Sequence, residues 1–150
     1  MRVSVVGGGR ADRATTDLAR RLGRILGERG HTVVCGGRGG VMAAVCEGAR
    51  EEGARTVGIL PGEDPAAAND HVEVPIVTGL GHARNPLVVL NGDAVIAVDG
   101  AAGTLSELGY AGVYDRPVTG LDTHEVPGVE PVEGPAEAVA HVERAVRGDD

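Results

Sequence analysis

Three short apolar runs of this chain each end in a glycine-rich turn that leads into a helical pattern, and this repetition restricts the possible folds more than any other feature. The runs cover residues 3–6, 32–35 and 94–98. The third run, Ala-Val-Ile-Ala-Val, is typical of a strand that is buried on both faces of a parallel sheet. Because such strands alternate with helices, the sequence predicts a single-domain α/β fold with a doubly wound parallel sheet of about six or seven strands.

The predicted element boundaries follow from apolar periodicity and from breaker residues. Strands are expected at residues 3–6, 32–35, 56–60, 72–77, 94–98 and 117–121, with one further edge strand inside the loop 123–133. Helices are expected at residues 17–29, 41–50, 84–90, 105–114 and 135–147. Thr16 and Thr104 are the predicted N-caps of the first and fourth helices, and Pro135 opens the last one. The whole of residues 1–150 is therefore predicted to form one domain.

The composition limits both the core and the partners. The chain has 150 residues with no Phe, no Trp and two Tyr, so Val, Leu, Ile and Ala must form the core. Tyr110 and Tyr114 are spaced as on one helix face, and no platform of aromatic residues is available for base stacking. The formal net charge of −8 also argues against nucleic-acid binding. All 14 basic residues are arginine, which fits either a salt-adapted or a GC-rich organism.

Several cofactor and metal sites are excluded by missing residues. Without lysine the chain forms neither a P-loop nor the Schiff base that holds pyridoxal phosphate. The dinucleotide fingerprint is absent because Asp12 occupies its last glycine position and Cys35 ends the second strand. Cys46 has no metal-type spacing from Cys35, and no two histidines are spaced H-x-x-x-H, so no metal site is predicted. Because no signal peptide or membrane-length apolar run is present, we expect a cytoplasmic protein without membrane contacts.

The turns at residues 36–40 and 100–103 predict an anion site. Doubly wound sheets bind ligands beyond the carboxyl ends of their strands, and unpaired N–H groups at a helix start bind phosphate where small residues let it approach. Arg84 and Glu107 flank the second turn, so an arginine and a carboxylate are expected beside the phosphate. The residues predicted to contact the ligand are Gly8, Gly9, Gly36, Gly37, Gly40, Met42, Asn85, Gly100, Gly103 and Thr104.

A structural interpretation of the same residues is also open. Thr104 and Glu107 have the spacing of a capping box, in which the threonine hydroxyl accepts from the glutamate N–H and the carboxylate accepts from the threonine N–H. The glycines can equally serve only as tight connections between strand and helix. The presence of two such turns favours the ligand site.

Two motifs make the chain resemble the LOG-like superfamily of Rossmann-like proteins. Residues 36–42 match its G-G-x-x-G-[LV]-M turn fully, and residues 99–107 match P-G-G-x-G-T-x-x-E with Asp for Pro and Ala for the second Gly. The arginine of its M-x-E-R-K stretch falls on Arg84, whereas the methionine, glutamate and lysine of this stretch are absent. With residues 58–62, the pattern is most similar to the small single-domain branch that includes the molybdenum-cofactor carrier protein. The resemblance covers residues 1–121.

The resemblance implies one of two functions. Enzymes of the superfamily hydrolyse the N-glycosidic bond of nucleoside 5′-monophosphates, including cytokinin precursors, and release the base and ribose 5-phosphate without a cofactor. By this resemblance Arg84 and Glu107 are the catalytic residues, because a carboxylate stabilises an oxocarbenium-like state and an arginine holds phosphate. The alternative is a non-catalytic carrier or sensor that holds a nucleotide or the molybdenum cofactor, a phosphorylated pterin. Ala83, Asn85 and Ala101 depart from the enzyme pattern and favour this alternative.

Family resemblance also implies a homodimer. Pairs of glycines leave a smooth surface on two of the predicted helices, at Gly23 and Gly27 and at Gly109 and Gly112. Helices pack closely across such surfaces, and association adds apolar core to a chain that is poor in aromatic residues.

Overall fold

One seven-stranded sheet organises the computed structural model, which describes residues 1–149, and every neighbouring pair of its strands is parallel. The strands are β1 (Arg2–Gly7), β2 (Thr32–Cys35), β3 (Thr56–Leu60), β4 (Val74–Val77), β5 (Ala94–Val98), β6 (Val118–Leu121) and β7 (Val129–Pro131). Their order across the sheet is β4-β3-β2-β1-β5-β6-β7. The predicted α/β fold is confirmed, and β7 is the edge strand that was expected in the loop before the last helix.

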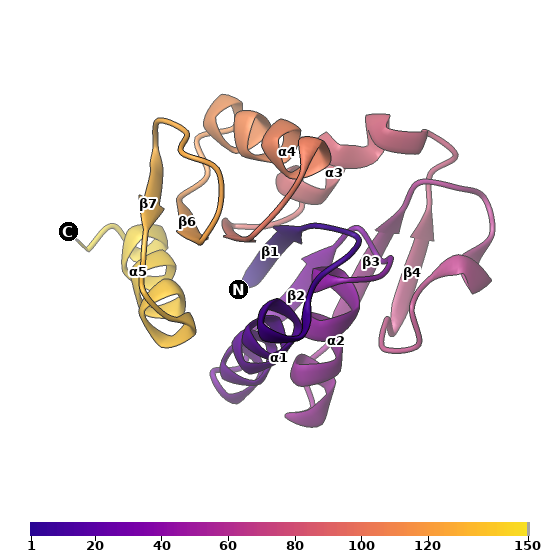
Figure 1. The fold of residues 1–150 in the computed structure, drawn as a ribbon, viewed down its shortest axis with the longest axis horizontal. Helices are drawn as coiled ribbons and strands as arrows, with labels where there is room; N and C mark the ends of the chain where they lie inside the picture. The colour runs from indigo at the N-terminus through magenta and orange to yellow at the C-terminus, as the bar shows by residue number, and fades with distance from the viewer. Residues whose placement is uncertain (150) are drawn as a thin grey trace.

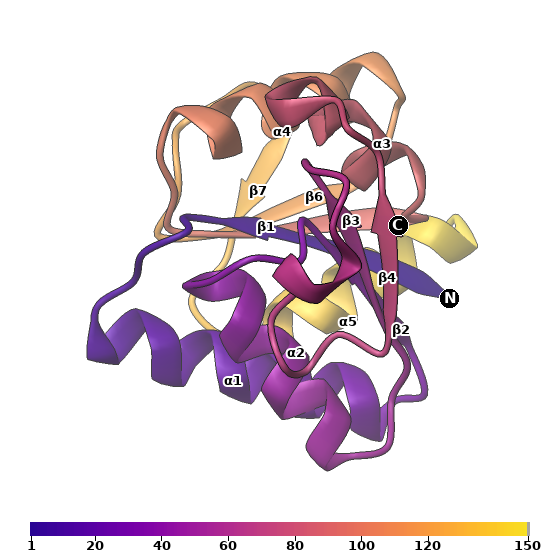
Figure 2. The ribbon, with the colours of Figure 1, turned by 90° about the vertical axis from the view of Figure 1, so that its right-hand side faces the viewer.

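Helices cover both faces of the sheet. On one face lie α1 (Arg13–Glu28), α2 (Val41–Glu51) and α5 (Pro135–Arg147), and on the other lie α3 (Asn85–Leu90) and α4 (Ala102–Val113), as Figure 1 and Figure 2 show from two sides. Short 3-10 turns, Pro65–Ala67 and Gly81–Arg84, lie in the connections on either side of β4. No helix within residues 1–149 combines the length and the apolar character that crossing a bilayer requires.

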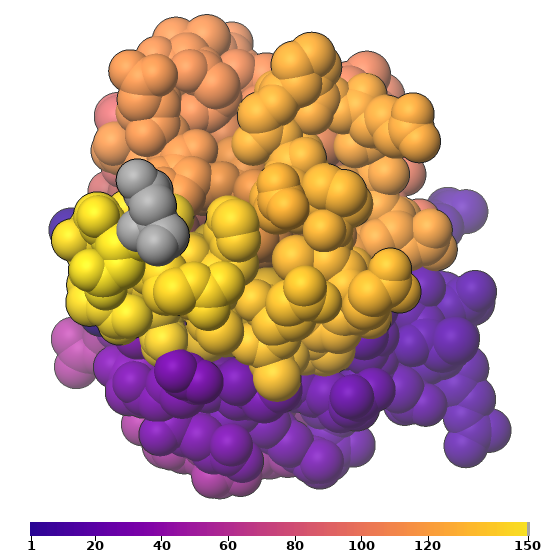
Figure 3. Space-filling model, turned by 90° about the vertical axis from the view of Figure 1, so that its left-hand side faces the viewer, coloured from indigo at the N-terminus to yellow at the C-terminus, as the bar shows by residue number. Residues whose placement is uncertain are grey.

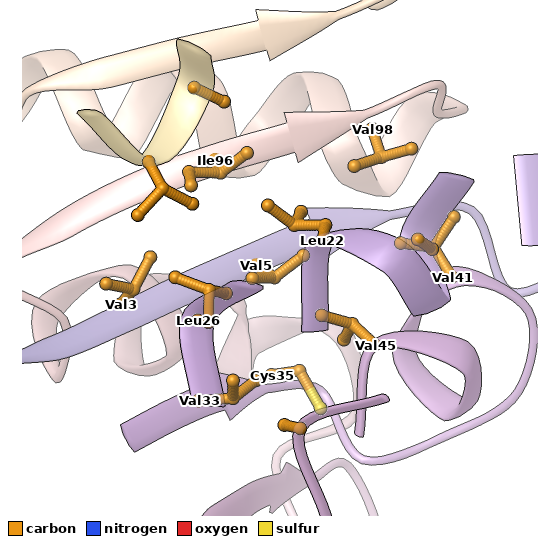
Figure 4. Packing of buried hydrophobic residues seen from close by; sticks show 14 of the residues in the cluster. Val3, Val5, Leu22, Leu26, Val33, Cys35, Val41, Val45, Ile96 and Val98 are labelled. Atoms are coloured by element: carbon orange, nitrogen blue, oxygen red, sulfur yellow. The ribbon is translucent and has the colours of Figure 1, made fainter. Parts of the chain in front are cut away.

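Alternation of side chains along each strand divides the core into two layers. Val3 and Val5 of β1 face the layer of α1, α2 and α5, where they belong to the same buried cluster as Leu22 of α1 (Figure 4). Val6 faces the opposite layer and packs with residues of α3 and α4 such as Leu108. Because the chain has no Phe and no Trp, both layers are filled by small aliphatic side chains, and the helices must approach the sheet and one another closely.

The close approach of α1 and α2 depends on glycine. A Cβ atom added to Gly23 of α1 would lie 2.1 Å from the carbonyl oxygen of Val45, and one added to Gly48 of α2 would lie 1.9 Å from the carbonyl oxygen of Arg20. Real Cβ contacts are essentially never that short, so any larger residue at these two positions would force the helices apart.

This contact corrects one half of the predicted dimer surface. Gly23 and Gly27 do not leave a smooth outer face, because both pack against α2 of the same chain. The prediction for these two glycines is therefore wrong. A Cβ atom at Gly109 or Gly112 would meet nothing within 4 Å, so the glycines of α4 do leave an open surface.

The start of α1 also differs from the prediction. Asp12 is the N-cap residue, and its carboxylate accepts a hydrogen bond of 2.8 Å from the N–H of Thr15. Thr16 lies inside the first turn, where its N–H donates to the carbonyl of Asp12 at 2.9 Å. The predicted cap at Thr16 is wrong because the helix can start earlier on a carboxylate, which interacts favourably with the positive end of the helix dipole.

The last helix, α5, closes one end of the molecule, and its predicted range of residues 135–147 is confirmed. Figure 3 shows α5 beside the segment that contains β7, with the N-terminal part of the chain below them. Val139 and Val142 of α5 pack into the core. The carboxylate of Glu143 accepts from the guanidinium of Arg29 at 2.8 and 2.5 Å and lies 2.6 Å from Nε2 of His31.

The order of the strands reverses direction at β1. Strands β2, β3 and β4 follow one another outward on one side, and the chain then crosses back to β5 on the other side of β1. Such a switch leaves a crevice at the carboxyl ends of the two central strands, because their connections run to opposite faces. Residues 7–9 of the turn after β1, with Ala101 and Gly103 of the turn after β5, line this crevice.

Candidate functional site

A cavity of about 600 Å³ lies at the carboxyl ends of the central strands. The glycine turns after β1 and β2, the 3-10 turn Gly81–Arg84 and the first two turns of α4 form its walls. Its lining residues are Val5, Val6, Gly7, Gly8, Gly9, Gly36, Arg38, Met42, Pro61, Gly62, Gly81, His82, Arg84, Asn85, Ala101, Gly103, Thr104 and Glu107.

Helix α4 begins at this cavity without a side-chain cap. Ala101 is its N-cap residue, and the backbone N–H groups of residues 102–104 have no acceptor among residues 1–149. These donors and the positive end of the helix dipole are suited to an anion. A Cβ atom added to Gly103 would meet only Asn85 Nδ2, at 3.8 Å, so the space beside this turn is open.

The capping-box interpretation of Thr104 and Glu107 is wrong. The helix starts at Ala102, so Thr104 is already a helical residue and its hydroxyl does not cap the helix. Gly100 has a φ of +133°, and a Cβ atom there would lie 2.6 Å from Cβ of Thr104. The turn at Gly100 is thus tight enough to start the helix earlier than the sequence indicates, and it leaves the carboxylate of Glu107 without a capping role.

Arg84 is buried in the wall of the cavity and held by three acceptors. Its side chain is 7% exposed; Nε donates to the carbonyl of Ile59 at 2.8 Å and Nη2 to the carbonyl of Gly36 at 3.3 Å. Nη1 donates to Oδ1 of Asn85. Burial lowers the pKa of Arg84, while Glu107 acts in the opposite direction. The guanidinium nevertheless stays charged, since arginine does not lose its proton in proteins, and its remaining N–H groups have no acceptor among the described residues.

Glu107 is a buried carboxyl group without a hydrogen-bond partner in residues 1–149. It lies one turn into α4, is 8% exposed and lines the cavity. Burial raises the pKa of Glu107 from 4.5 to about 7, and the positive charge of Arg84 limits the rise. A carboxyl group with this pKa can accept or donate a proton near neutral pH, which is the property of a general acid or base.

The glycine turn at residues 36–40 is packed closely against neighbouring segments. A Cβ atom on Gly36 would lie 2.7 Å from Nη2 of Arg84, so a larger residue there would displace the guanidinium from its present position. Gly40 has a φ of +60°, and its Cβ position is 2.3 Å from the carbonyl oxygen of Gly8. That same oxygen accepts a hydrogen bond of 3.1 Å from the N–H of Val41, the first residue of α2. The backbone after β1 therefore already satisfies this donor at the start of α2.

Most of the predicted site residues meet at this one cavity. Gly8, Gly9, Gly36, Met42, Arg84, Asn85, Gly103, Thr104 and Glu107 line it. Gly37, Gly40 and Gly100 are not among the lining residues, and their positive φ values place them in tight backbone turns. The predicted ligand contacts of all these residues stay predictions, and for the last three the geometry shows a structural use.

Several residues that line the cavity were not predicted from the sequence. Arg38, Pro61 and Gly62 were not named as site residues, although all three follow a strand at its carboxyl end. Their position along the strands was the available signal, because every loop at that edge of a doubly wound sheet is close to the crevice. His82, the one histidine that lies near the predicted site in the sequence, also lines the cavity. Within residues 1–149, no group of three His, Cys, Asp or Glu side chains is placed to hold a metal ion.

Known proteins resemble this chain in sequence and in structure. The family model described as the SLOG cluster4 family matches residues 1–146. An uncharacterized protein of Archaeoglobus fulgidus is 39% identical over 140 residues, which cover 93% of this chain and 92% of that protein. The cytokinin riboside 5′-monophosphate phosphoribohydrolase of Mycobacterium tuberculosis is 35% identical over 116 residues, which cover 71% of this chain but only 62% of that enzyme.

Solved structures are similar to this chain over almost its whole length. The molybdenum cofactor binding protein of the phototrophic bacterium Rippkaea orientalis aligns with a TM-score of 0.91 and 31% identity. The alignment covers 97% of this chain and 96% of that protein.

Proposed function

Since this chain belongs to the SLOG cluster4 family, we propose that it binds a phosphorylated small molecule in its cavity, with the phosphate on the first turn of α4. The observation that carries the proposal is the set of N–H groups of residues 102–104, which have no acceptor among residues 1–149, at a helix start where Ala101, Gly103 and Thr104 line the cavity. Arg38 and Arg84 add positive charge to the same walls. Helix dipole and arginine together favour a phosphate over a neutral group.

If the ligand is a nucleoside 5′-monophosphate, Glu107 has a catalytic role in its hydrolysis. This carboxyl group is buried, has no partner among the described residues, and lies one turn along α4 from the proposed phosphate site. In hydrolysis the bond from C1′ to the base nitrogen breaks and a water oxygen bonds to C1′. Glu107 takes the proton of the attacking water and returns it to the departing base, and its charge stabilises the oxocarbenium-like sugar. The named activity of the mycobacterial relative is consistent with this chemistry.

A second function, the carriage of the molybdenum cofactor without turnover, is favoured by a different observation. The similarity to the cofactor-binding protein of Rippkaea orientalis extends over 97% of this chain, whereas the match to the mycobacterial enzyme covers 71%. The phosphate of this pterin needs the same donors on α4. Asn85 stands at the position where the enzyme motif has a lysine, and its side-chain amide is hydrogen-bonded to Arg84 and Ser106.

Two measurements on the purified protein separate these functions. We would unfold it and identify any released small molecule by mass spectrometry, and we would assay ribose 5-phosphate release from AMP and other nucleoside monophosphates. Release of ribose 5-phosphate supports the hydrolase; a released phosphorylated pterin without any hydrolysis supports the carrier. If no phosphorylated molecule is released and calorimetry detects no binding of AMP or inorganic phosphate, the proposed function is wrong.

A further inference from the structure

A chain of hydrogen bonds joins Arg84 to the first turn of α4. Nη1 of Arg84 donates to Oδ1 of Asn85, and Nδ2 of Asn85 donates to Oγ of Ser106 at 3.0 Å. The hydroxyl of Ser106 then donates to the carbonyl oxygen of Gly103 at 2.7 Å. The four groups come from the 3-10 turn before α3, from α3 and from α4, so the chain connects separate elements across the cavity wall.

Every donor in this chain of bonds points the same way, from the guanidinium towards α4. Arg84 has donors only, so the oxygen of the Asn85 amide must face it and the nitrogen must face Ser106. The hydroxyl of Ser106 accepts this bond and donates its own hydrogen bond to the carbonyl oxygen of Gly103. Hydrogen bonds in such a directed series polarise and strengthen one another, particularly where water is excluded. Asn85 and Arg84 are 4% and 7% exposed, so the first bond of the series is buried, whereas Ser106 and its bond to Gly103 are exposed.

The last acceptor in the series is significant because of the peptide group to which it belongs. The carbonyl of Gly103 and the N–H of Thr104 are the two ends of one peptide unit. This N–H is among the donors at the start of α4 that have no acceptor within residues 1–149. A hydrogen bond to the carbonyl draws electron density from the amide nitrogen, which makes the N–H a stronger donor and fixes the plane of the peptide.

We propose that Asn85 and Ser106 are positioning residues that join the guanidinium of Arg84 and the N–H of Thr104 into one anion-binding unit. Neither residue needs to touch the ligand to do so. Asn85 fixes the guanidinium from one side while the carbonyls of Ile59 and Gly36 fix it from others. Ser106 links Asn85 to the carbonyl of Gly103 and so connects the fixed guanidinium to the first turn of α4. We call the series of hydrogen bonds from Arg84 through Asn85 and Ser106 to Gly103 the relay. The effect on ligand affinity rests on the proposed function, but the relay itself is present in the protein without ligand.

The test combines a ligand-free and a ligand-bound measurement on four variants: Ser106→Ala, Asn85→Ala, the double variant and Ser106→Thr. In free protein we would record the ¹⁵N–¹H signals of the Arg84 guanidinium, assigned by their loss in Arg84→Ala, and that of the Thr104 amide. Ser106→Ala and Asn85→Ala should shift the Thr104 signal and speed the exchange of the Arg84 protons. Ser106→Thr keeps a hydroxyl at the same place and should restore both signals.

Affinity for AMP is then measured by calorimetry with the same proteins. Each alanine variant should bind about tenfold more weakly, since one hydrogen bond in the relay contributes on the order of one power of ten. The double variant should be hardly weaker than either single one, because groups in one network are not additive, and Ser106→Thr should bind like the parent.

The outcomes separate this inference from the proposed function. Unchanged Arg84 and Thr104 signals in Ser106→Ala would overturn the relay, as would additive losses of affinity in the double variant. If the parent binds neither AMP nor inorganic phosphate and releases no phosphorylated molecule on unfolding, the proposed function fails, and the spectra of the free proteins still decide whether the relay exists.

Discussion

The chemistry of single residues in this site follows from burial. Arg84 and Glu107 carry opposite charges in one cavity, yet no hydrogen bond joins them, because the guanidinium is turned to the carbonyls of Gly36 and Ile59 and to Asn85. Glu107 therefore bears the cost of burial without a direct partner, which is why its pKa rises to about 7. A group held in this way is destabilising for the fold and available for a ligand or a proton.

The replacement of Glu107 by glutamine should remove hydrolysis and, above neutral pH, stabilise the protein. The pKa of Glu107 is 4.5 unfolded and about 7 folded. Because the folded pKa is raised, the contribution of Glu107 to the free energy of unfolding is fully present below pH 4.5 and is lost as the pH rises towards 7. In urea unfolding, the parent should lose up to about 3 kcal/mol between pH 4.5 and pH 8 through this group, and Glu107→Gln should not show this loss.

The same variant is assayed for ribose 5-phosphate release from AMP. If Glu107 takes the proton of the attacking water, activity should fall by roughly 100-fold or more. Glu125→Gln, at an exposed carboxylate, is the matched control and should keep both the activity and the pH profile of the parent. Hydrolysis that survives in Glu107→Gln would rule out the catalytic assignment, and an unchanged pH profile would rule out the buried charge.

The sequence predicted Arg84 and Glu107 but not how they are held. Both were identified because they occupy defined places in recognisable motifs. The bonds of Asn85 and Ser106 join α3 to α4, and such long-range contacts have no local sequence signal. The pattern Thr-x-x-Glu at residues 104–107 favoured a capping box, and the tight turn at Gly100 overrode it. The start of α4 is thus set by the geometry of the connection from β5 and not by the local preference of Thr104 for an N-cap position.

Among the elements, the first turn of α4 is the proposed binding site for the phosphate. Gly103→Val should abolish AMP binding or weaken it at least tenfold, because the branched side chain fills the space beside the N–H groups. The fold should tolerate the change, since the new Cβ would meet only Asn85 Nδ2 at an ordinary 3.8 Å. Calorimetry with AMP measures the effect, and thermal unfolding checks that the protein remains folded.

A matched control exists at another helix start. Gly134 is the N-cap of α5, lies outside the cavity, and its Cβ position has no neighbour within 4 Å. Gly134→Val should therefore leave AMP affinity unchanged. Unaltered binding in Gly103→Val would contradict the phosphate site on α4, and equal losses in both variants would assign the effect to valine at a helix start.

The attachment of α5 depends on one carboxylate. Burial alone would raise the pKa of Glu143, but its contacts with His31 and Arg29 lower it below the ordinary value of 4.5. A lowered folded pKa means that this contribution to stability is present above pH 4.5 and is lost as the pH falls through the folded value. Glu143→Gln should thus destabilise the protein at pH 7, by on the order of 1–2 kcal/mol.

Urea unfolding at pH 7 and at pH 3 measures this effect, and the difference between Glu143→Gln and the parent should shrink at the lower pH. Glu137→Gln changes an exposed carboxylate of the same helix and serves as the control. Equal stability of Glu143→Gln and the parent at pH 7 would show that the apolar contacts of α5 alone hold it in place.

At the scale of the whole molecule, the alternation of strands and helices was sufficient to predict the sheet. Buried runs such as Ala94–Val98 leave little choice but a parallel sheet with helices on both faces. The strand order needed the structure, because nothing local tells the chain to return beside β1 after β4. The cavity depends on that return, so its full lining could not be read from the motifs.

Assembly is the property of the whole molecule that the surface predicts. The outer face of α4 carries Leu105, Tyr110 and Val113 with exposed fractions of 47%, 37% and 70%. Gly109 and Gly112 lie between them with open space above their Cα atoms. Glu107 is the sole charged residue of α4 and is buried. In a chain of net charge −8, this uncharged face is where two copies can meet without electrostatic repulsion.

We therefore expect a homodimer through α4, and Val113→Arg should convert it to a monomer, because each copy would place a charge in the centre of a symmetric apolar contact. Light scattering at micromolar concentration, in low and high salt, measures the mass of both proteins. Val146→Arg is the matched control: this valine is 40% exposed on α5, on the opposite face of the sheet, and the change should leave the dimer intact. A parent that is monomeric in both salts would refute the dimer, and a dimer that survives Val113→Arg would place the contact elsewhere.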